Sequence, residues 1–230
     1  MRVAALYDVH GNLPALESVL ADPRCADVDV VVCGGDLCAG PMPVEVLSLM
    51  QARGALFVRG NADRELTGWP AERLSNAQLE LLRSWPTTLT LEVDGLGPVV
   101  FCHGSPCSDD EILTRITPAE AVTEACAGAP LVVGGHTHVQ FDRVAGHTRL
   151  VNAGSVGMPY EGRTAAFWAL LGTDIELVGT EYDVEEAVAA ILATGYPCAG
   201  DLPENLLTPP TAEEATAFFE TQREARRRGS

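Results

Sequence analysis

The segment RVAALYDVHGN, residues 2–12, indicates the architecture of the first half of the chain. Its first six residues, 2–7, are mostly apolar and indicate a buried strand, and the polar DVHGN follows at once. The next segment, PALESVLA at 14–21, is typical of a helix that carries proline in its first turn. A strand, a polar turn and a helix in this order form the opening unit of a parallel α/β sheet.

The same pattern continues downstream. Strand 28–33 precedes Gly-Gly-Asp, helix 43–53 again opens with a proline, and strand 55–58 precedes Gly-Asn. A helical region at 64–86 follows. The first half of the chain therefore predicts a βαβαβ unit with parallel strands.

From residue 88 onward, short apolar segments are separated by tight glycine or aspartate turns, a pattern that predicts antiparallel hairpins. The segment 196–210 holds four prolines and is predicted to be an irregular connector. Two sheets packed face to face, with helices outside, would use both halves in one domain. The expected strands are 88–93, 98–102, 131–134, 139–144, 148–152, 164–171 and 174–182, and the expected helices are 118–127, 184–194 and 211–227.

The composition restricts the class of protein. The 230 residues are 47% apolar, which excludes a wholly disordered chain. The formal net charge of -17 argues against a nucleic-acid duplex as partner, because such partners require a basic surface. Neither a secretory pattern nor a stretch of about 20 apolar residues occurs, so we expect a cytoplasmic protein without a membrane partner. The seven cysteines include no CxxC and are expected to be buried and reduced.

Five polar clusters each follow a predicted strand. Ligands of open α/β sheets bind beyond the carboxyl ends of the strands, so these clusters are expected to converge on one place. His147 lies instead in a hairpin turn without an acidic neighbour and is interpreted as a solvated turn residue. The clusters are Asp8-Val9-His10-Gly11-Asn12, Gly34-Gly35-Asp36, Gly60-Asn61, His103-Gly104 and Gly135-His136-Thr137-His138.

The residue types of the clusters favour a metal site. In an extended chain, alternation would put Asp8 and His10 on one side, where they can bind one ion, and His136 and His138 repeat this spacing. Glycines beside the ligands would let the backbone turn away from a crowded site. Carboxylate, imidazole and amide ligands without thiolate suit manganese, iron or zinc better than calcium or magnesium. Each motif alone is common, and only their coincidence predicts function.

The ordered set DxH, GGD, GN, H and GHTH resembles the calcineurin-like metallophosphoesterase superfamily, and within it the small bacterial and archaeal stand-alone phosphodiesterases. The segment Asn152–Pro159 resembles the NPGS segment of that branch, with Ala153 in place of proline. The resemblance covers 1–183 as a metallophosphoesterase domain, and 184–230 is expected to be a helical extension packed on it. It implies an α/β fold, a four-layer αββα sandwich of two mixed β-sheets flanked by helices.

The resemblance also implies two divalent transition-metal ions, manganese, iron, zinc or nickel, with manganese favoured. A metal-bridging hydroxide would attack the phosphate ester, with Asp36, Asn61 and His103 in catalytic roles. The first ion would be bound by Asp8, His10, Asp36 and His138, and the second by Asp36, Asn61, His103 and His136.

Two positions depart from the family pattern. Many members carry a histidine after the GN asparagine, as a general acid, and an aspartate that orients it; here these positions are Ala62 and Ala39. Protonation of the leaving group is therefore in question. Asp63 is expected to cap a helix or to hold a ligand histidine.

The substrate is expected to be a small phosphorylated molecule such as a nucleotide, and the oligomeric state stays open. Arg64 and Arg163 are candidate phosphate clamps, although either could be an ordinary surface arginine. Tyr7 and Tyr160 could stack on a base or simply pack.

Four functions compete. A phosphodiester hydrolase is favoured over a phosphomonoesterase, and the alternative is a dinucleoside polyphosphate hydrolase of the diadenosine tetraphosphate type, in which Trp69 and Trp85 would line the site. From another class, a scaffold or binding module on the same fold is disfavoured because all seven ligand positions are chemically competent.

Overall fold

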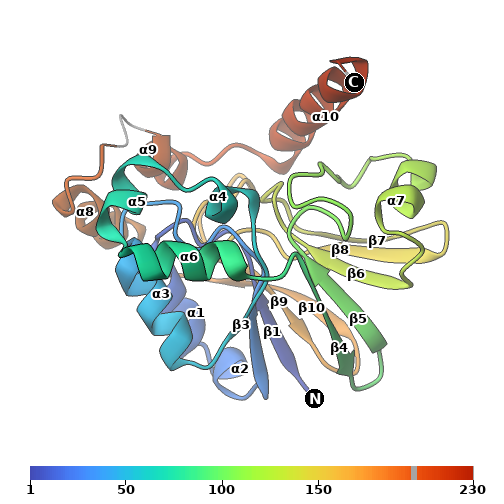
Figure 1. Cartoon of the computed structure of the whole chain (residues 1–230), viewed down its shortest axis with the longest axis horizontal. Coiled ribbons are helices and arrows are strands. Elements are labelled where there is room, and N and C mark those ends of the chain that lie inside the picture. The colour runs from blue at the N-terminus through green and yellow to red at the C-terminus, as the bar shows by residue number, and fades with distance from the viewer. Residues whose placement is uncertain (198–200, 230) are drawn as a thin grey trace.

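A computed structural model describes residues 1–197 and 201–229. Two five-stranded sheets lie against each other, with helices on their outer faces (Figure 1). The expected four-layer arrangement of two mixed sheets is confirmed. Among the described residues, no helix is both long and apolar enough to cross a bilayer.

The first sheet has the order β10-β9-β1-β2-β3. β1 (Val3–Leu6), β2 (Val30–Cys33) and β3 (Leu56–Phe57) are parallel, as predicted. β9 (Ala166–Leu171) pairs antiparallel with both β1 and β10 (Ile175–Thr180). The central strand β1 therefore lies between β2 from the first half of the chain and β9 from the second half.

The second sheet has the order β4-β5-β6-β8-β7. The hairpin of β4 (Thr88–Val93) and β5 (Gly97–Cys102) forms as expected, and so does that of β7 (Phe141–Ala145) and β8 (Thr148–Asn152), whose turn exposes His147. β6 (Leu131–Gly134) runs parallel to β5 and β8, so this half is mixed rather than purely antiparallel.

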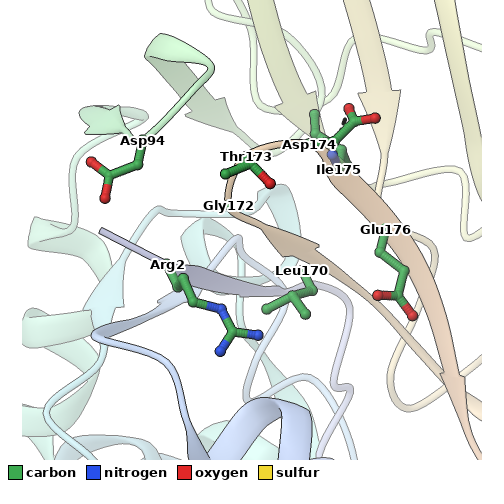
Figure 2. A pocket seen from close by; sticks show the side chains of 8 residues that line it. All are labelled: Arg2, Asp94, Leu170, Gly172, Thr173, Asp174, Ile175 and Glu176. Atoms are coloured by element: carbon green, nitrogen blue, oxygen red, sulfur yellow. Dashed lines mark hydrogen bonds between the residues drawn. The ribbon is translucent and has the colours of Figure 1, made fainter.

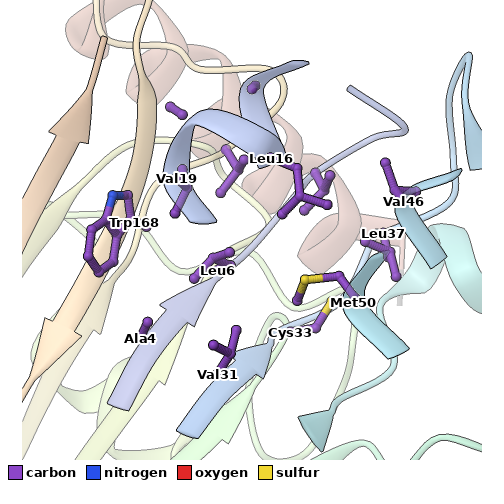
Figure 3. Close-up of a cluster of buried hydrophobic side chains, with 14 of the residues drawn as sticks. Ala4, Leu6, Leu16, Val19, Val31, Cys33, Leu37, Val46, Met50 and Trp168 are labelled. Atoms are coloured by element: carbon purple, nitrogen blue, oxygen red, sulfur yellow. The ribbon is translucent and has the colours of Figure 1, made fainter. Parts of the chain in front are cut away.

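Alternate residues of β1 serve two hydrophobic cores. Val3, Ala5 and Tyr7 pack between the two sheets, whereas Ala4 and Leu6 face the helices on the outer side (Figure 3). The sequence of a strand buried on both faces is a continuous apolar run, because successive side chains point to opposite faces and both faces are apolar. This explains why the opening stretch shows no polar alternation.

The helices of the first half are shorter and more numerous than expected. α1 (Leu13–Ala21), α2 (Pro23–Ala26) and α3 (Pro43–Ala52) precede three separate helices, α4 (Asn61–Arg64), α5 (Gly68–Arg73) and α6 (Asn76–Ser84). The region predicted to be helical over 64–86 therefore holds two short helices, α5 and α6, and the end of α4. Gly68 has a φ of +61°, and Ser75 caps α6 by accepting a hydrogen bond from the Gln78 amide, so both interrupt a continuous helix.

The C-terminal region is more helical than predicted. α7 (Ala119–Ala125), α8 (Val184–Ala193) and α10 (Ala212–Gly229) lie where helices were expected. The irregular connector predicted at 196–210 is wrong in part, because α9 (Asp201–Leu207) lies within it; residues 198–200 are outside the described residues. Pro203 is tolerated because it falls in the first turn of α9.

The helices after residue 183 contribute to a core of their own. Ile191 of α8 and Leu202 and Leu206 of α9 are buried in one cluster with Met42, next to α3. Of the six cysteines in the described part of the chain, five are buried thiols and Cys107 is exposed. Cys198 lies outside the described residues.

Candidate metal centre

The carboxyl ends of four strands bring the predicted ligands together. Asp8 and His10 follow β1, Asp36 follows β2, His103 follows β5, and the GHTH segment follows β6. At the first of two clusters, His138 Nε2 lies 3.2 Å from Asp8 Oδ1 and 3.3 Å from His10 Nε2. His10 Nε2 lies 3.7 Å from Asp8 Oδ1.

The second cluster contains Asp8, Asp36 and His103. His103 Nε2 lies 3.3 Å from Asp36 Oδ2 and 3.7 Å from Asp8 Oδ1. Asp36 Oδ2 is also 4.0 Å from His10 Nε2 in the first cluster. Both carboxylates therefore lie between the clusters, whereas the resemblance implied Asp36 alone as the shared ligand.

Unpaired buried atoms indicate that this arrangement fits a metal ion. Among the described residues, four atoms of the predicted ligands are buried without a hydrogen-bond partner: Asp8 Oδ1, Asn61 Oδ1, His103 Nε2 and His136 Nε2. Buried polar atoms are normally paired, so their combination is a physical reason to expect a ligand. Carboxylate, amide and imidazole donors together suit a divalent transition metal.

Backbone groups contact the candidate ligands on the side that faces away from the site and so orient them. The Nδ1 atoms of three histidines face carbonyl oxygens, which leaves Nε2 directed into the site. Backbone amides of His136 and Ala62 donate to Asp8 Oδ2 at 2.9 Å and to Asp36 Oδ1 at 2.8 Å. The histidine contacts are His10 with Ala39 O at 3.3 Å, His103 with Gly34 O at 2.9 Å and His138 with Met158 O at 2.6 Å.

The backbone at the ligands is left-handed, not extended. This corrects the expected alternation of Asp8 with His10, which meet because of their turn conformation and not because of strand geometry. The same turn conformation places His138 near Asp8 and His136 near His103. The ring centroids of His136 and His103 are 5.2 Å apart. Such conformations cost about 1–3 kcal/mol each and concentrate at functional sites. The φ angles are 53° at Asp8, 48° at His10, 52° at Asp36, 66° at His136 and 56° at His138.

Two glycines next to the ligands are required by close packing. A Cβ atom on Gly60 would lie 2.1 Å from Asp36 Oδ1, and one on Gly135 would lie 2.5 Å from Asp8 Oδ2. Neither glycine has a positive φ. At these positions glycine leaves room for the carboxylates, whereas Gly11 and Gly35, next to the ligands His10 and Asp36, have the positive φ angles of a turn, 63° and 106°.

The ligands perturb one another electrostatically. Burial opposes ionisation of Asp8, but the neighbouring His138 and His103 outweigh it, and the pKa of this carboxyl falls well below its usual value. Burial lowers the pKa of His103, but Asp36 and Asp8 outweigh it and raise the pKa to about 10. Burial, assisted by His103, lowers the pKa of His136 to about 4, which favours the neutral imidazole that a metal needs.

Asp63 holds the loop that carries Asp36. Its buried carboxylate accepts hydrogen bonds from the amides of Asp36 at 2.8 Å, Leu37 at 3.1 Å and Gly60 at 3.1 Å. Burial and the charge of Asp36 raise the pKa of Asp63. The expectation of helix capping is right for the Gly60 amide, but the bonds to the Asp36 loop were missed because they span 26–27 residues.

We expect Asp63→Asn to destabilise the fold by about 2–4 kcal/mol and to weaken metal binding about 10–100-fold, because an amide group would face backbone donors. Denaturant unfolding and metal titration would measure the two effects. Asp183→Asn is the matched control, since exposed Asp183 caps α8 through the Glu186 amide and asparagine caps equally well. Equal stability of the two variants would contradict this role.

The segment Asn152–Ser155, at the end of β8 and just beyond it, also orients the site, and sequence reasoning assigned it no role. Asn152 Nδ2 donates to Gly135 O at 2.6 Å and to Thr137 Oγ1 at 3.0 Å. Ser155 Oγ donates to Asp8 O at 2.7 Å. This segment therefore fixes the loops after β1 and β6. In the sequence, the polar residues of Asn152-Ala153-Gly154-Ser155 were the feature that could have indicated this role.

The candidate substrate arginines have partners within the protein. Arg64 pairs with the buried Asp109 and, at 2.9 Å, with Glu65. Arg163 lies over the ring of Phe167, 4.7 Å from its centroid. Their role as phosphate clamps stays a prediction.

The four aromatic residues considered for the site have different positions. Tyr7 is fully buried and donates to Val133 O at 2.8 Å, and Trp85 is buried against Phe57. Trp69 packs edge-on against Tyr196. Tyr160 instead stacks on His138, with ring centroids 4.8 Å apart and planes 20° from parallel. Of the four, Tyr160 is therefore the one whose ring stacks on a candidate ligand.

A cavity of about 490 Å³ lies at the other edge of the sheets (Figure 2). Its lining includes Arg2, which precedes β1, and Asp174 in the turn between β9 and β10, whereas Asp8 and His10 follow β1. None of the predicted metal ligands lines it. This cavity is therefore separate from the candidate metal centre.

Comparisons with known proteins agree with the geometry. A solved metallophosphoesterase from Sphaerobacter thermophilus is 26% identical, with a TM-score of 0.72 over 91% of this chain and 98% of that one. A hypothetical protein from Pyrococcus horikoshii shares the fold, with a TM-score of 0.78 at 19% identity over 91% and 99% of the two chains. An uncharacterized protein from Methanocaldococcus jannaschii is 27% identical over 85% of this chain and 93% of that relative.

The family model that matches is the calcineurin-like phosphoesterase superfamily domain, over residues 1–174. This range contains every candidate ligand and, among the described residues, every strand except β10. The chain therefore belongs to the calcineurin-like phosphoesterase superfamily.

Proposed function

We propose that this protein hydrolyses a phosphate ester, with a phosphodiester as the favoured substrate, at two divalent metal ions. The observation that carries the proposal is the set of four buried, unpaired donor atoms among the seven predicted ligands. Asp8, His10, Asp36 and His138 would bind one ion. Asp36, Asn61, His103 and His136 would bind the other, and the position of Asp8 within both clusters supports a second shared carboxylate.

Two bound ions would supply positive charge for the phosphoryl oxygens and lower the pKa of water. The contribution of the protein's own residues to catalysis would be to position the ligands. Backbone carbonyls hold the histidine rings, and Asp63 fixes the Asp36 loop before substrate arrives. Local positive charge matters here because a chain with a net charge of -17 repels a phosphate at long range.

The decisive experiment combines elemental analysis of the purified protein with hydrolysis of bis(p-nitrophenyl) phosphate in the presence of manganese. We expect about two transition-metal ions per chain and turnover that a chelator abolishes and manganese restores. Bound metal without turnover on any ester of a panel of diesters, monoesters and dinucleoside polyphosphates would favour a scaffold or binding module instead.

A dinucleoside polyphosphate hydrolase is the second candidate. At the positions where many members have an acid and its orienter, this chain uses only backbone groups: the Ala62 amide donates to Asp36 Oδ1, and the Ala39 carbonyl faces His10 Nδ1. An expelled phosphate needs no proton, so the missing side chain is compatible with a polyphosphate substrate. The substrate panel separates the two candidates.

Metal removal is expected to lower thermal stability. An ion that binds only the folded state, present at about a thousand times its Kd, contributes about 4 kcal/mol to the free energy of unfolding. For a chain of this size that corresponds to roughly 10 °C in Tm. Melting curves with and without a chelator provide the measurement, and the Asp36→Asn variant should respond little to the chelator. Identical curves for the native protein would count against an occupied site.

A further inference from the structure

The C-terminal helix α10 forms part of the rim of the candidate metal centre. It lies on the side of the sheets where β1 ends, opposite the amino terminus (Figure 1). The Phe219 ring centroid is 6.2 Å from that of His136 and 6.4 Å from that of Tyr160. Tyr160 in turn stacks on His138. Two aromatic rings therefore stand directly beside two predicted metal ligands.

A cavity of about 300 Å³ lies against these rings. Tyr160, Phe218 and Phe219 line it, together with Asn205 of α9 and Glu214 of α10. Phe218 is 58% exposed and packs edge-on against Phe219, with centroids 5.6 Å apart. All lining residues except Tyr160 lie beyond the 1–174 match to the family model, so the superfamily domain does not define this cavity.

We propose that this cavity, the aromatic pocket, binds the nucleobase of a phosphorylated substrate whose phosphate lies at the metal centre. The inference rests on the proposed function, because the metal centre fixes where the phosphate lies. Flat bases stack on aromatic side chains, and such stacking tolerates differences in sequence. The pocket volume is at the lower end of the range for small-molecule sites, which suits one ring system and not a large ligand.

The charge distribution favours recognition of the substrate by stacking on its base over recognition by ionic contacts alone. The protein carries a net charge of -17, and Arg64 is already paired with Asp109 and Glu65. Stacking on Tyr160, Phe218 and Phe219 provides attraction that this negative field does not oppose.

Polar groups in the pocket suit the edge of a base. The side-chain amide of Asn205 can both donate and accept hydrogen bonds. Glu214 Oε2 accepts from the Thr211 amide at 2.9 Å and hydroxyl at 2.8 Å, which holds its carboxylate in place. A fixed carboxylate favours a ring with an exocyclic amino group, such as adenine.

The test compares two ligands that differ only in the base. Adenosine 5′-monophosphate and ribose 5-phosphate are titrated into metal-loaded protein by calorimetry. We expect the native protein to bind the nucleotide about ten- to hundredfold more tightly than the sugar phosphate, a range set by ring stacking. Equal affinity for both ligands would overturn the inference.

Two variants assign any preference to the pocket. Phe219→Leu keeps an apolar side chain but removes the flat ring, and its metal content is measured because Phe219 is close to His136. Phe218→Ala removes an exposed ring that is not itself against a predicted ligand. Both should lose most of the preference for the base. Thr221→Ala, on the same helix outside the pocket lining, should retain it. A preference that survives both pocket variants overturns the inference.

Hydrolysis measured separately distinguishes failure of this inference from failure of the proposed function. Turnover of bis(p-nitrophenyl) phosphate together with equal binding of the two ligands overturns the pocket and leaves the phosphoesterase. Base-dependent binding that both ring variants abolish supports the pocket even where no ester is turned over, and in that case only the proposed function fails.

Discussion

Replacing Asp36 by asparagine is expected to remove bound metal and to lower kcat by more than about a thousandfold. Asp36 Oδ2 lies 3.3 Å from His103 Nε2 and 4.0 Å from His10 Nε2, so the carboxylate serves both clusters. The amide keeps the shape of the carboxylate but loses the charge that binds a cation. Elemental analysis and hydrolysis of bis(p-nitrophenyl) phosphate measure the two losses.

Asparagine is the appropriate substitution because it tolerates the left-handed φ of 52° at this position. The fold should therefore persist, and circular dichroism would verify it. Asp174→Asn is the matched control, with the same chemical change in the turn at the opposite edge of the sheets (Figure 2). Full metal content and full activity in Asp36→Asn would refute the proposed centre.

The second large effect concerns the leaving group. Ala62 and Ala39 stand where many members of the superfamily carry an acid and its orienter, and both contact the ligands only through their backbones. General acid catalysis is typically worth about 10²–10⁴ in rate, most of all for poor leaving groups. We therefore expect the rate to fall steeply as the pKa of the leaving group rises, with nitrophenyl esters fast and simple alkyl esters slow.

The measurement is a series of aryl and alkyl phosphodiesters at saturating manganese, with log kcat plotted against leaving-group pKa. Single-turnover experiments establish that chemistry limits the rate. Ala62→His provides the reverse test, since a histidine there should speed the poorest leaving groups most and flatten the plot. A flat plot for the native protein, with chemistry rate-limiting, would mean that another residue supplies the proton.

Local sequence signals predicted the sheets and the set of candidate ligands. Apolar runs of four to eight residues indicate buried strands, and polar residues directly after them must lie at strand ends. Parallel strands of one sheet share a carboxyl edge, so the proximity of Asp8 to Asp36 and of His103 to the loop of His138 follows from strand order. The meeting of these two groups required the packing of the two sheets. The helix boundaries at 64–86 and the presence of α9 were missed because single glycine, serine and proline positions decide them.

Local sequence patterns were therefore enough to predict which residue types lie at the strand ends and that these types suit a metal. The tertiary structure alone decided which atoms meet: the left-handed backbone at the ligands, Asp8 between both clusters, Asp63 on the Asp36 loop, and Phe219 of α10 beside His136. The physical reason is range. Periodicity and turn chemistry act over a few residues, whereas these contacts join segments 26 or more residues apart and exist only after both sheets have packed.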